Sequence, residues 1–98
     1  MFATLDPLLH SELRLAVMSI LISVEEADFV YLREKTGATA GNLSVQIEKL
    51  SEAEYIEVER GFLGKRTRTT CRISAKGIKA FEEYVEALKT YLNPPKSE

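Results

Sequence analysis

The chain has 98 residues, 45% of them hydrophobic, enough for one compact domain that buries a smaller share of its surface than a larger protein would. A single cysteine excludes an intrachain disulfide, and no apolar run reaches the roughly 18 residues of a membrane span. Residues 1–9 lack the features of a signal peptide. We therefore expect a soluble cytoplasmic domain over residues 1–92 with no membrane partner. A short polar tail would follow over 93–98, where two prolines prevent further helix.

The positive charge of this chain is unevenly placed. The net charge is −2, from 13 Lys and Arg against 15 Asp and Glu. Five of the basic residues and no acidic one fall between positions 60 and 72; they are Arg60, Lys65, Arg66, Arg68 and Arg72. Subtracting these five leaves 8 basic residues against 15 acidic ones, so a local charge of +5 adjoins a remainder of −7. Such a cluster is typical of a surface that binds a polyanion such as DNA.

The first predicted helix has two possible starts: Asp6 and Pro7 can open a turn of helix, and Ser11 can cap the main helix after it. Its apolar residues repeat at helical spacing on two faces. One stripe contains Leu13, Ala16, Val17, Ile20, Leu21 and Val24, and the other contains Leu8, Leu15, Met18 and Ile22. We therefore expect this helix to be covered on two sides, by the core and by either the last helix or another subunit.

Two shorter helices follow. The first should be capped by Asp28, run for about two turns and end at Gly37, a residue suited to the left-handed conformation. After a tight link, Thr39 should cap the second, whose inward residues Leu43, Ile47 and Leu50 are spaced four and three apart. Its opposite face has small residues, which suit close approach to another surface.

Next, the period changes from helical to alternating. Ile56 and Val58 share the inward side of a predicted strand, and Gly61 and Gly64 should bracket a turn containing Phe62 and Leu63. In the returning strand we expect two inward residues, Cys71 and Ile73, and three outward ones, Arg68, Thr70 and Arg72.

The last predicted helix follows Ser74 and has two apolar stripes. Ile78, Phe81, Val85, Leu88 and Leu92 form a seam of coiled-coil type, and Ala80, Tyr84, Ala87 and Tyr91 form the second stripe. Because the first and last helices would each expose one stripe, we expect a homodimer between them. The predicted interface residues are Leu8, Leu15, Met18, Ile22, Tyr84, Val85, Leu88, Tyr91 and Leu92.

The order of helix, helix, helix, hairpin and helix is that of a winged helix-turn-helix, a mainly α fold with a small β-hairpin, a three-helix core and a long C-terminal helix. From Leu9 to Leu88 the chain also resembles small winged-helix transcriptional regulators related to the MarR and ArsR groups. The segments that match are "LHSELRLAVMSIL", "DFVYLREKTGATAGNLSVQIEKLSEAEYIEVER", "FLGKRTRTTCRIS" and "AKGIKAFEEYVEAL".

The resemblance implies a recognition helix over 39–53 and a wing over 57–73. The implied DNA-binding residues are Thr39, Ala40, Gly41, Asn42, Ser44, Val45 and Lys49 on the helix, and Lys65, Arg66 and Arg68 near the wing tip. Gly77, in the turn that starts the final helix, would pack against the first helix. The chain departs from its relatives at Glu54, where they usually have Gly, and around Val45, where they have basic residues or His. We therefore expect a geometry other than left-handed at Glu54, and base readout that is weak or shared with the wing.

Other candidate sites have structural interpretations. His10 is the only histidine, and Cys71 on an inward strand face is most simply a core residue, against a redox sensor that would need an exposed thiol. Lys49 could contact DNA or pair with Glu48 or Glu52. No phosphate loop, nucleophile motif or metal-ligand cluster occurs, so we predict no enzyme, cofactor or metal site.

The predicted function is a homodimeric transcriptional regulator that binds specific sequences of double-stranded DNA, with the recognition helix in the major groove and the wing on the backbone or minor groove. The alternative is a winged helix that binds proteins and not DNA. The net negative charge and the few cations on the recognition helix favour that alternative, whereas the basic wing opposes it. The sequence leaves any effector unidentified.

Overall fold

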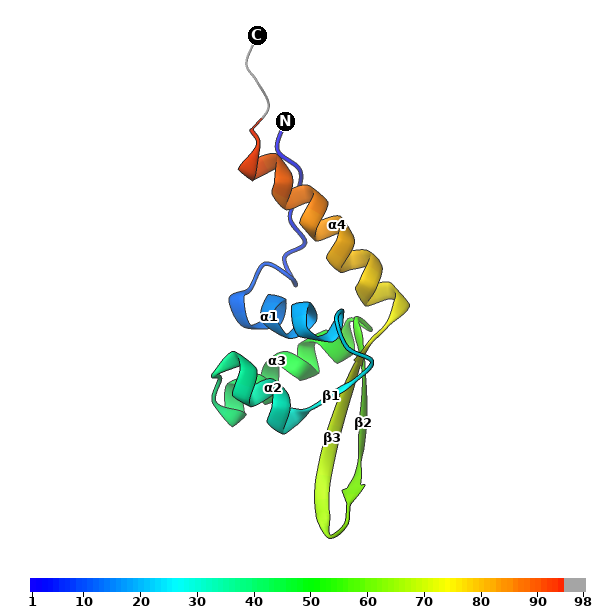
Figure 1. Ribbon diagram of the computed structural model, residues 1–98. Coiled ribbons are helices and arrows are strands. Elements are labelled where there is room, and N and C mark those ends of the chain that lie inside the picture. Colours follow the sequence, from blue (N-terminus) through cyan, green and yellow to red (C-terminus); the bar gives the residue numbers. More distant parts are fainter. Residues whose placement is uncertain (95–98) are drawn as a thin grey trace.

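The structure, a computed structural model, describes residues 1–94, so residues 95–98 of the predicted tail lie outside the described part. Four helices and a small antiparallel sheet follow the predicted order, which confirms the fold class (Figure 1). The elements are α1 (Glu12–Leu21), β1 (Ala27–Asp28), α2 (Phe29–Thr36), α3 (Ala40–Glu52), β2 (Ile56–Leu63), β3 (Arg66–Ile73) and α4 (Ala75–Leu92).

All four helices begin directly after residues that the sequence identifies as possible caps. In each case the cap side chain accepts a hydrogen bond from the backbone N–H three residues later; the caps are Ser11, Asp28, Thr39 and Ser74. Gly37 ends α2 with a φ of 71°, the left-handed conformation that glycine adopts without strain. Helix α1 ends at Leu21, so Val24 of its predicted stripe lies in the following loop.

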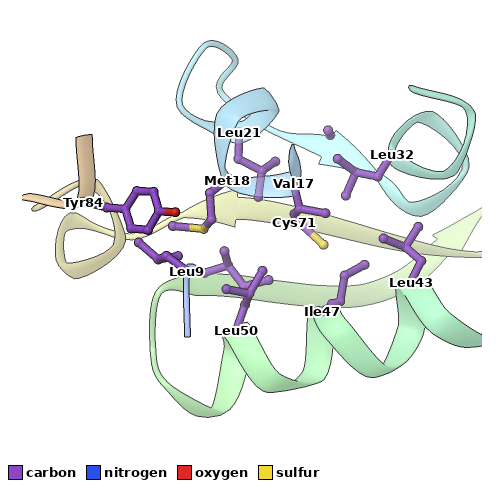
Figure 2. Close-up of a cluster of buried hydrophobic side chains, with 12 residues drawn as sticks. Leu9, Val17, Met18, Leu21, Leu32, Leu43, Ile47, Leu50, Cys71 and Tyr84 are labelled. Carbon is purple, nitrogen blue, oxygen red and sulfur yellow. The ribbon is translucent and has the colours of Figure 1, made fainter. Parts of the chain in front are cut away.

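The core lies where α1, α2 and α3 meet the sheet (Figure 2). Leu43, Ile47 and Leu50 of α3 point into it, as predicted. Helix α1 contributes residues from both predicted stripes: Val17, Leu21 and Met18 are all fully buried. Helix α1 contacts α2, α3 and β3, so its two apolar stripes together form one broad buried face.

The sheet has a strand that the sequence did not reveal. Its order is β1-β3-β2, and β1 pairs with β3 through Ala27 opposite Cys71 and Asp28 opposite Thr70. Because β1 covers this part of β3, Thr70 is buried, and its predicted outward exposure is wrong. A two-residue strand next to a helix cap carries no alternating pattern that would reveal it.

The hairpin turn also differs from the prediction. Phe62 and Leu63 belong to β2, and Leu63 pairs with Arg66, so the loop consists of Gly64 and Lys65 alone. Gly64 has a φ of 65°. A glycine with positive φ at the first position of a two-residue loop matches the twist of the flanking strands.

Helix α4 and the hairpin project from opposite sides of the helical core (Figure 1). The radius of gyration is 15.3 Å, larger than the value of about 13 Å for a compact domain of this size. The N-terminal segment runs beside α4 and is joined to it by hydrogen bonds from Ala3 N to Thr90 Oγ1 and from the Tyr91 hydroxyl to Ala3 O. This segment of the same chain therefore covers one side of α4.

Glu54 and Gly77 lie at the junction between α3, the sheet and α4. Glu54 has a φ of 64°, so the left-handed geometry persists without glycine and the expectation of another geometry is wrong. A Cβ on Gly77 would stand 2.0 Å from the carbonyl oxygen of Tyr55. Gly77 therefore does allow close packing, but against the backbone of Tyr55 and not against α1.

Tyr55 connects this junction to the N-terminal segment. Its hydroxyl donates a hydrogen bond of 2.6 Å to Asp6 Oδ2, and its carbonyl accepts from Ser74 N at 3.0 Å. The hydrogen bond to Asp6, together with burial, raises the pKa of Tyr55 to about 12.

Candidate nucleic-acid interface

Helix α3 presents one long face to solvent. The predicted contact residues Thr39, Ala40, Gly41, Asn42, Ser44, Val45 and Lys49 are all exposed. Asn42 lies in the first turn, where its backbone N–H donates to the Thr39 cap. Glu48 and Glu52 share the exposed part of the helix, and within residues 1–94 Lys49 pairs with neither of them. The helix can thus approach a partner closely, with little positive charge of its own.

The wing supplies a cation next to this helix that the predicted contact residues omit. Arg60 and Thr69 face each other across the hairpin, and together with Ser44, Phe29 and Ile47 they line one surface hollow. Strand alternation could have identified Arg60, because it follows Ile56 and Val58 on the side of the sheet that faces the helices. The base of the wing and the middle of α3 therefore form one continuous surface.

The wing tip carries exposed cations and apolar side chains together. Lys65 and Arg66 are exposed, and neither has an ion-pair partner in the part of the chain that the structure describes. Beside them Phe62 is 76% exposed and Leu63 is 65% exposed. Nothing in this projecting loop neutralises its charge.

The other two cations of the basic stretch have carboxylate partners that lie outside residues 60–72. Arg68 Nε lies 3.4 Å from Asp28 Oδ2, and Arg72 contacts both Glu26 Oε1 at 3.4 Å and Glu59 Oε2 at 3.3 Å. All three acidic partners come from strands or loops that the fold brings alongside β3. Within residues 1–94, the cations of the basic stretch that have no carboxylate partner are therefore Arg60 and the two at the tip, Lys65 and Arg66.

A chain of hydrogen bonds links α1 to the first turns of α3. Arg14 donates through Nε to the Leu8 carbonyl at 2.6 Å and through a terminal nitrogen to Gln46 Oε1. Gln46 Nε2 then donates to Asn42 Oδ1 at 2.9 Å. A side chain on the exposed end of α3 is thus connected to the N-terminal segment.

The far side of the molecule has an apolar surface on α4. Ile78, Val85 and Leu92 of the predicted seam remain exposed. Met18 and Tyr84 of the predicted dimer interface are instead buried within the chain, because α1 packs into the core and His10 Nδ1 lies 3.1 Å from the Tyr84 hydroxyl. Because both side chains are buried, they cannot contact a second copy of the chain. Met18 and Tyr84 are therefore removed from the predicted dimer interface.

The remaining candidate groups are structural. Cys71 is fully buried, and burial raises the pKa of its thiol to about 11, which opposes the thiolate that a redox sensor requires. In residues 1–94 no three His, Cys, Asp or Glu side chains lie close enough together to hold a metal ion. No helix there is both long and apolar enough to span a membrane.

Comparison with known proteins identifies the architecture described above. The sequence profile of the winged helix DNA-binding domain family matches residues 13–92. The chain belongs to this family. The match covers all four helices, apart from the first residue of α1, and the whole hairpin, so the recognition helix and wing implied by the sequence lie inside this winged helix domain.

Individual relatives agree with this assignment. The uncharacterized protein MJ0432 of Methanocaldococcus jannaschii is 33% identical over 76 residues, which cover 78% of this winged helix domain chain and 83% of the relative. A transcriptional regulator homologue from Pyrococcus horikoshii OT3 has a TM-score of 0.80 at 23% identity, covering 88% of this chain and 85% of that one. A transcriptional regulator from Clostridium thermocellum has a TM-score of 0.69 at 19% identity and covers 93% of both chains. These two structures are similar to the domain in fold.

Proposed function

We propose that this winged helix domain is a transcriptional regulator that binds specific sequences of double-stranded DNA as a homodimer. Helix α3 enters the major groove, and the wing contacts the backbone or the adjacent minor groove. Residues Thr39, Ala40, Gly41, Asn42, Ser44, Val45 and Lys49 make the contacts of the helix. Lys65, Arg66 and Arg60 make those of the wing, whereas Arg68 contributes less because Asp28 already pairs with it.

The observation that carries this proposal is the joint surface of α3 and the wing. Arg60 adjoins Ser44, and the unpaired Lys65 and Arg66 extend beyond them on the projecting hairpin. Each phosphate that a cation neutralises releases counterions and adds salt-dependent affinity. Short polar side chains on α3 can meanwhile reach base edges in the major groove, where the four base pairs differ.

The exposed seam of α4 supports the homodimer. Val85 and Leu92 leave apolar surface uncovered on a helix that projects away from the wing, while the N-terminal segment covers another side of α4. A second copy that packs on this seam would remove that surface from water at about 25 cal/mol per Å². A two-fold axis would then relate two recognition helices, which predicts palindromic half-sites about 10 base pairs apart or a multiple of that spacing.

A second candidate function is a protein-interaction module. It is favoured by the exposed carboxylates of Glu48 and Glu52, which α3 would have to bring near phosphates in the DNA complex. Their charge suits a basic protein surface better than a nucleic acid.

Binding to a pool of random duplexes separates the two functions. We expect selective enrichment of a palindromic sequence at low salt, and binding of the selected duplex that weakens steeply as salt rises. The absence of any duplex binding at low salt would reject the DNA-binding function in favour of the protein-interaction module.

A further inference from the structure

The hydrogen-bond chain from Arg14 through Gln46 to Asn42 determines which atoms α3 can offer to DNA. A guanidinium has five N–H groups and no acceptor. The atom of Gln46 that faces Arg14 must therefore be the amide oxygen, whichever way the two similar ends of the amide are drawn.

The orientation of Gln46 in turn fixes that of Asn42. With its oxygen held by Arg14, Gln46 can present only its NH₂ group to Asn42, 2.9 Å away. The atom of Asn42 that meets this donor must be Oδ1. The NH₂ group of Asn42 is then the end that faces away from Gln46 and remains available for a ligand.

The three side chains differ in their access to solvent. Arg14 and Gln46 are partly buried between α1 and α3, whereas Asn42 is exposed on the first turn of α3. A second hydrogen bond fixes the guanidinium of Arg14, whose Nε donates to the Leu8 carbonyl at 2.6 Å. Asn42 can thus contact a base, while Arg14 acts only through Gln46.

We propose that Arg14 is a positioning residue that makes Asn42 a hydrogen-bond donor to DNA, so that α3 prefers guanine at the base that Asn42 contacts. This inference rests on the proposed function. Guanine offers two acceptors in the major groove, N7 and O6, whereas cytosine offers the N4 amino donor. Asparagine commonly pairs with adenine by using both its oxygen and its NH₂ group. Here Gln46 holds the oxygen on its own side of Asn42, so the NH₂ group is the end that can reach a base.

Three variants change the hydrogen-bond chain from Arg14 through Gln46 to Asn42 in different ways. In Gln46→Glu the carboxylate accepts from both Arg14 and Asn42, so Asn42 turns its oxygen outward and prefers cytosine. Arg14→Met leaves the Gln46 amide free to turn over, so the preference is lost. Arg14→Lys still only donates, so it retains the guanine preference. Arg33→Met is the charge control, because it also removes one arginine charge, but from an exposed position on α2.

The test uses the duplex selected by the parent protein. Asn42→Ala identifies the position at which the base preference depends on this residue. There, one G·C pair is inverted to C·G, and the ratio of the two affinities is measured by fluorescence anisotropy for each variant. Because both duplexes carry the same charge, the ratio cancels the general electrostatic effect of each substitution. We expect the parent, Arg14→Lys and Arg33→Met to favour guanine about threefold to tenfold, the range that one hydrogen bond supplies. Arg14→Met should bring the ratio close to one, and Gln46→Glu should reverse it.

A parent preference for adenine or cytosine would overturn the inference. So would an unchanged guanine preference in both Arg14→Met and Gln46→Glu. In either case the parent still discriminates between sequences, so the proposed function stands. If the parent binds the selected duplex no more tightly than random DNA, the proposed function fails and this inference fails with it.

Discussion

Replacing Gly77 with alanine tests the packing between α4 and Tyr55, in the segment that follows α3. Alanine is favoured over glycine inside a helix by about 1 kcal/mol. At this position, however, its Cβ would lie 2.0 Å from the oxygen and 2.9 Å from the carbon of the Tyr55 carbonyl. Both atoms are backbone, and the carbonyl also accepts the hydrogen bond from Ser74 N, so it cannot move aside without breaking that bond. Overpacking of this kind costs about 1–3 kcal/mol, so we expect the overlap to outweigh the helical gain.

Gly41 supplies the matched control for this substitution. It lies in α3, and a Cβ there would meet no heavy atom within 4 Å. Gly41→Ala should therefore raise the free energy of unfolding by about 0.5–1 kcal/mol, whereas Gly77→Ala should lower it by about 1–2 kcal/mol. For a domain of this size, 1 kcal/mol corresponds to about 4–8 °C in Tm. Circular dichroism at a fixed protein concentration measures both. If Gly77→Ala raised Tm as much as Gly41→Ala does, the packing argument would be refuted.

Three further predictions concern the junction and the dimer. Glu54→Gly should raise the free energy of unfolding by up to about 1 kcal/mol in urea titrations, because it relieves a left-handed non-glycine residue; a loss of stability would contradict that account. Tyr55→Phe should be less stable than the parent by about 1–2 kcal/mol at neutral pH, since it removes the hydrogen bond to Asp6. The pKa of Tyr55 in the folded state is about 12, above its ordinary value of 10. The stability difference between the parent and Tyr55→Phe should therefore persist below pH 10 and shrink as the pH approaches 12. A stability difference that stayed constant between pH 10 and 12 would contradict this account. Val85→Asp should convert a dimer to a monomer in sedimentation at micromolar concentration, while Lys79→Asp, at an exposed polar position of the same helix, should not; equal masses for all three proteins would exclude the α4 seam as the interface.

Local signals in the sequence predicted the helices well. Each helix starts at a side chain that can accept a hydrogen bond from the backbone three residues later, and this interaction lies entirely within one short segment. The same is true of Gly37, whose left-handed conformation is a property of the residue itself. The starts of the helices, the end of α2 and the inward face of α3 could therefore be predicted without knowledge of the fold, whereas the end of α1 could not.

Features that depend on distant segments escaped prediction. Thr70 is buried because β1, more than forty residues earlier in the chain, pairs with β3. Glu26 and Asp28 approach Arg72 and Arg68 for the same reason, so two cations of the basic stretch are neutralised by residues outside it. The contact of Gly77 with Tyr55 likewise needs α4 to return to the end of α3. None of these pairings leaves a periodic pattern in one segment.

The residues of the candidate site likewise include some that one segment of the sequence predicts and others that depend on the fold. The exposed face of α3 follows from its helical period, and the charge of the wing follows from composition. Strand alternation could have placed Arg60 on the side of the sheet that faces the helices, but its position beside Ser44 depends on the fold. The orientation of Asn42 likewise requires the contact of Arg14 with Gln46. The predicted interface residues Met18 and Tyr84 were misplaced because apolar residues at helical spacing do not distinguish a core from a contact between subunits.

The most direct test of DNA binding by the wing is the salt dependence of affinity for the variant Lys65→Ala/Arg66→Ala. The control Lys79→Ala/Lys89→Ala removes the same charge from α4, on the side of the molecule opposite the wing. Each lost phosphate contact should reduce the slope of log affinity against log salt by about 0.9, so the wing variant should lose up to about 1.8. Its affinity should fall for selected and random duplexes alike, while the control keeps the slope of the parent. A wing variant with the slope and affinity of the parent would contradict DNA contact by the wing, and the protein-interaction module would then be the better account.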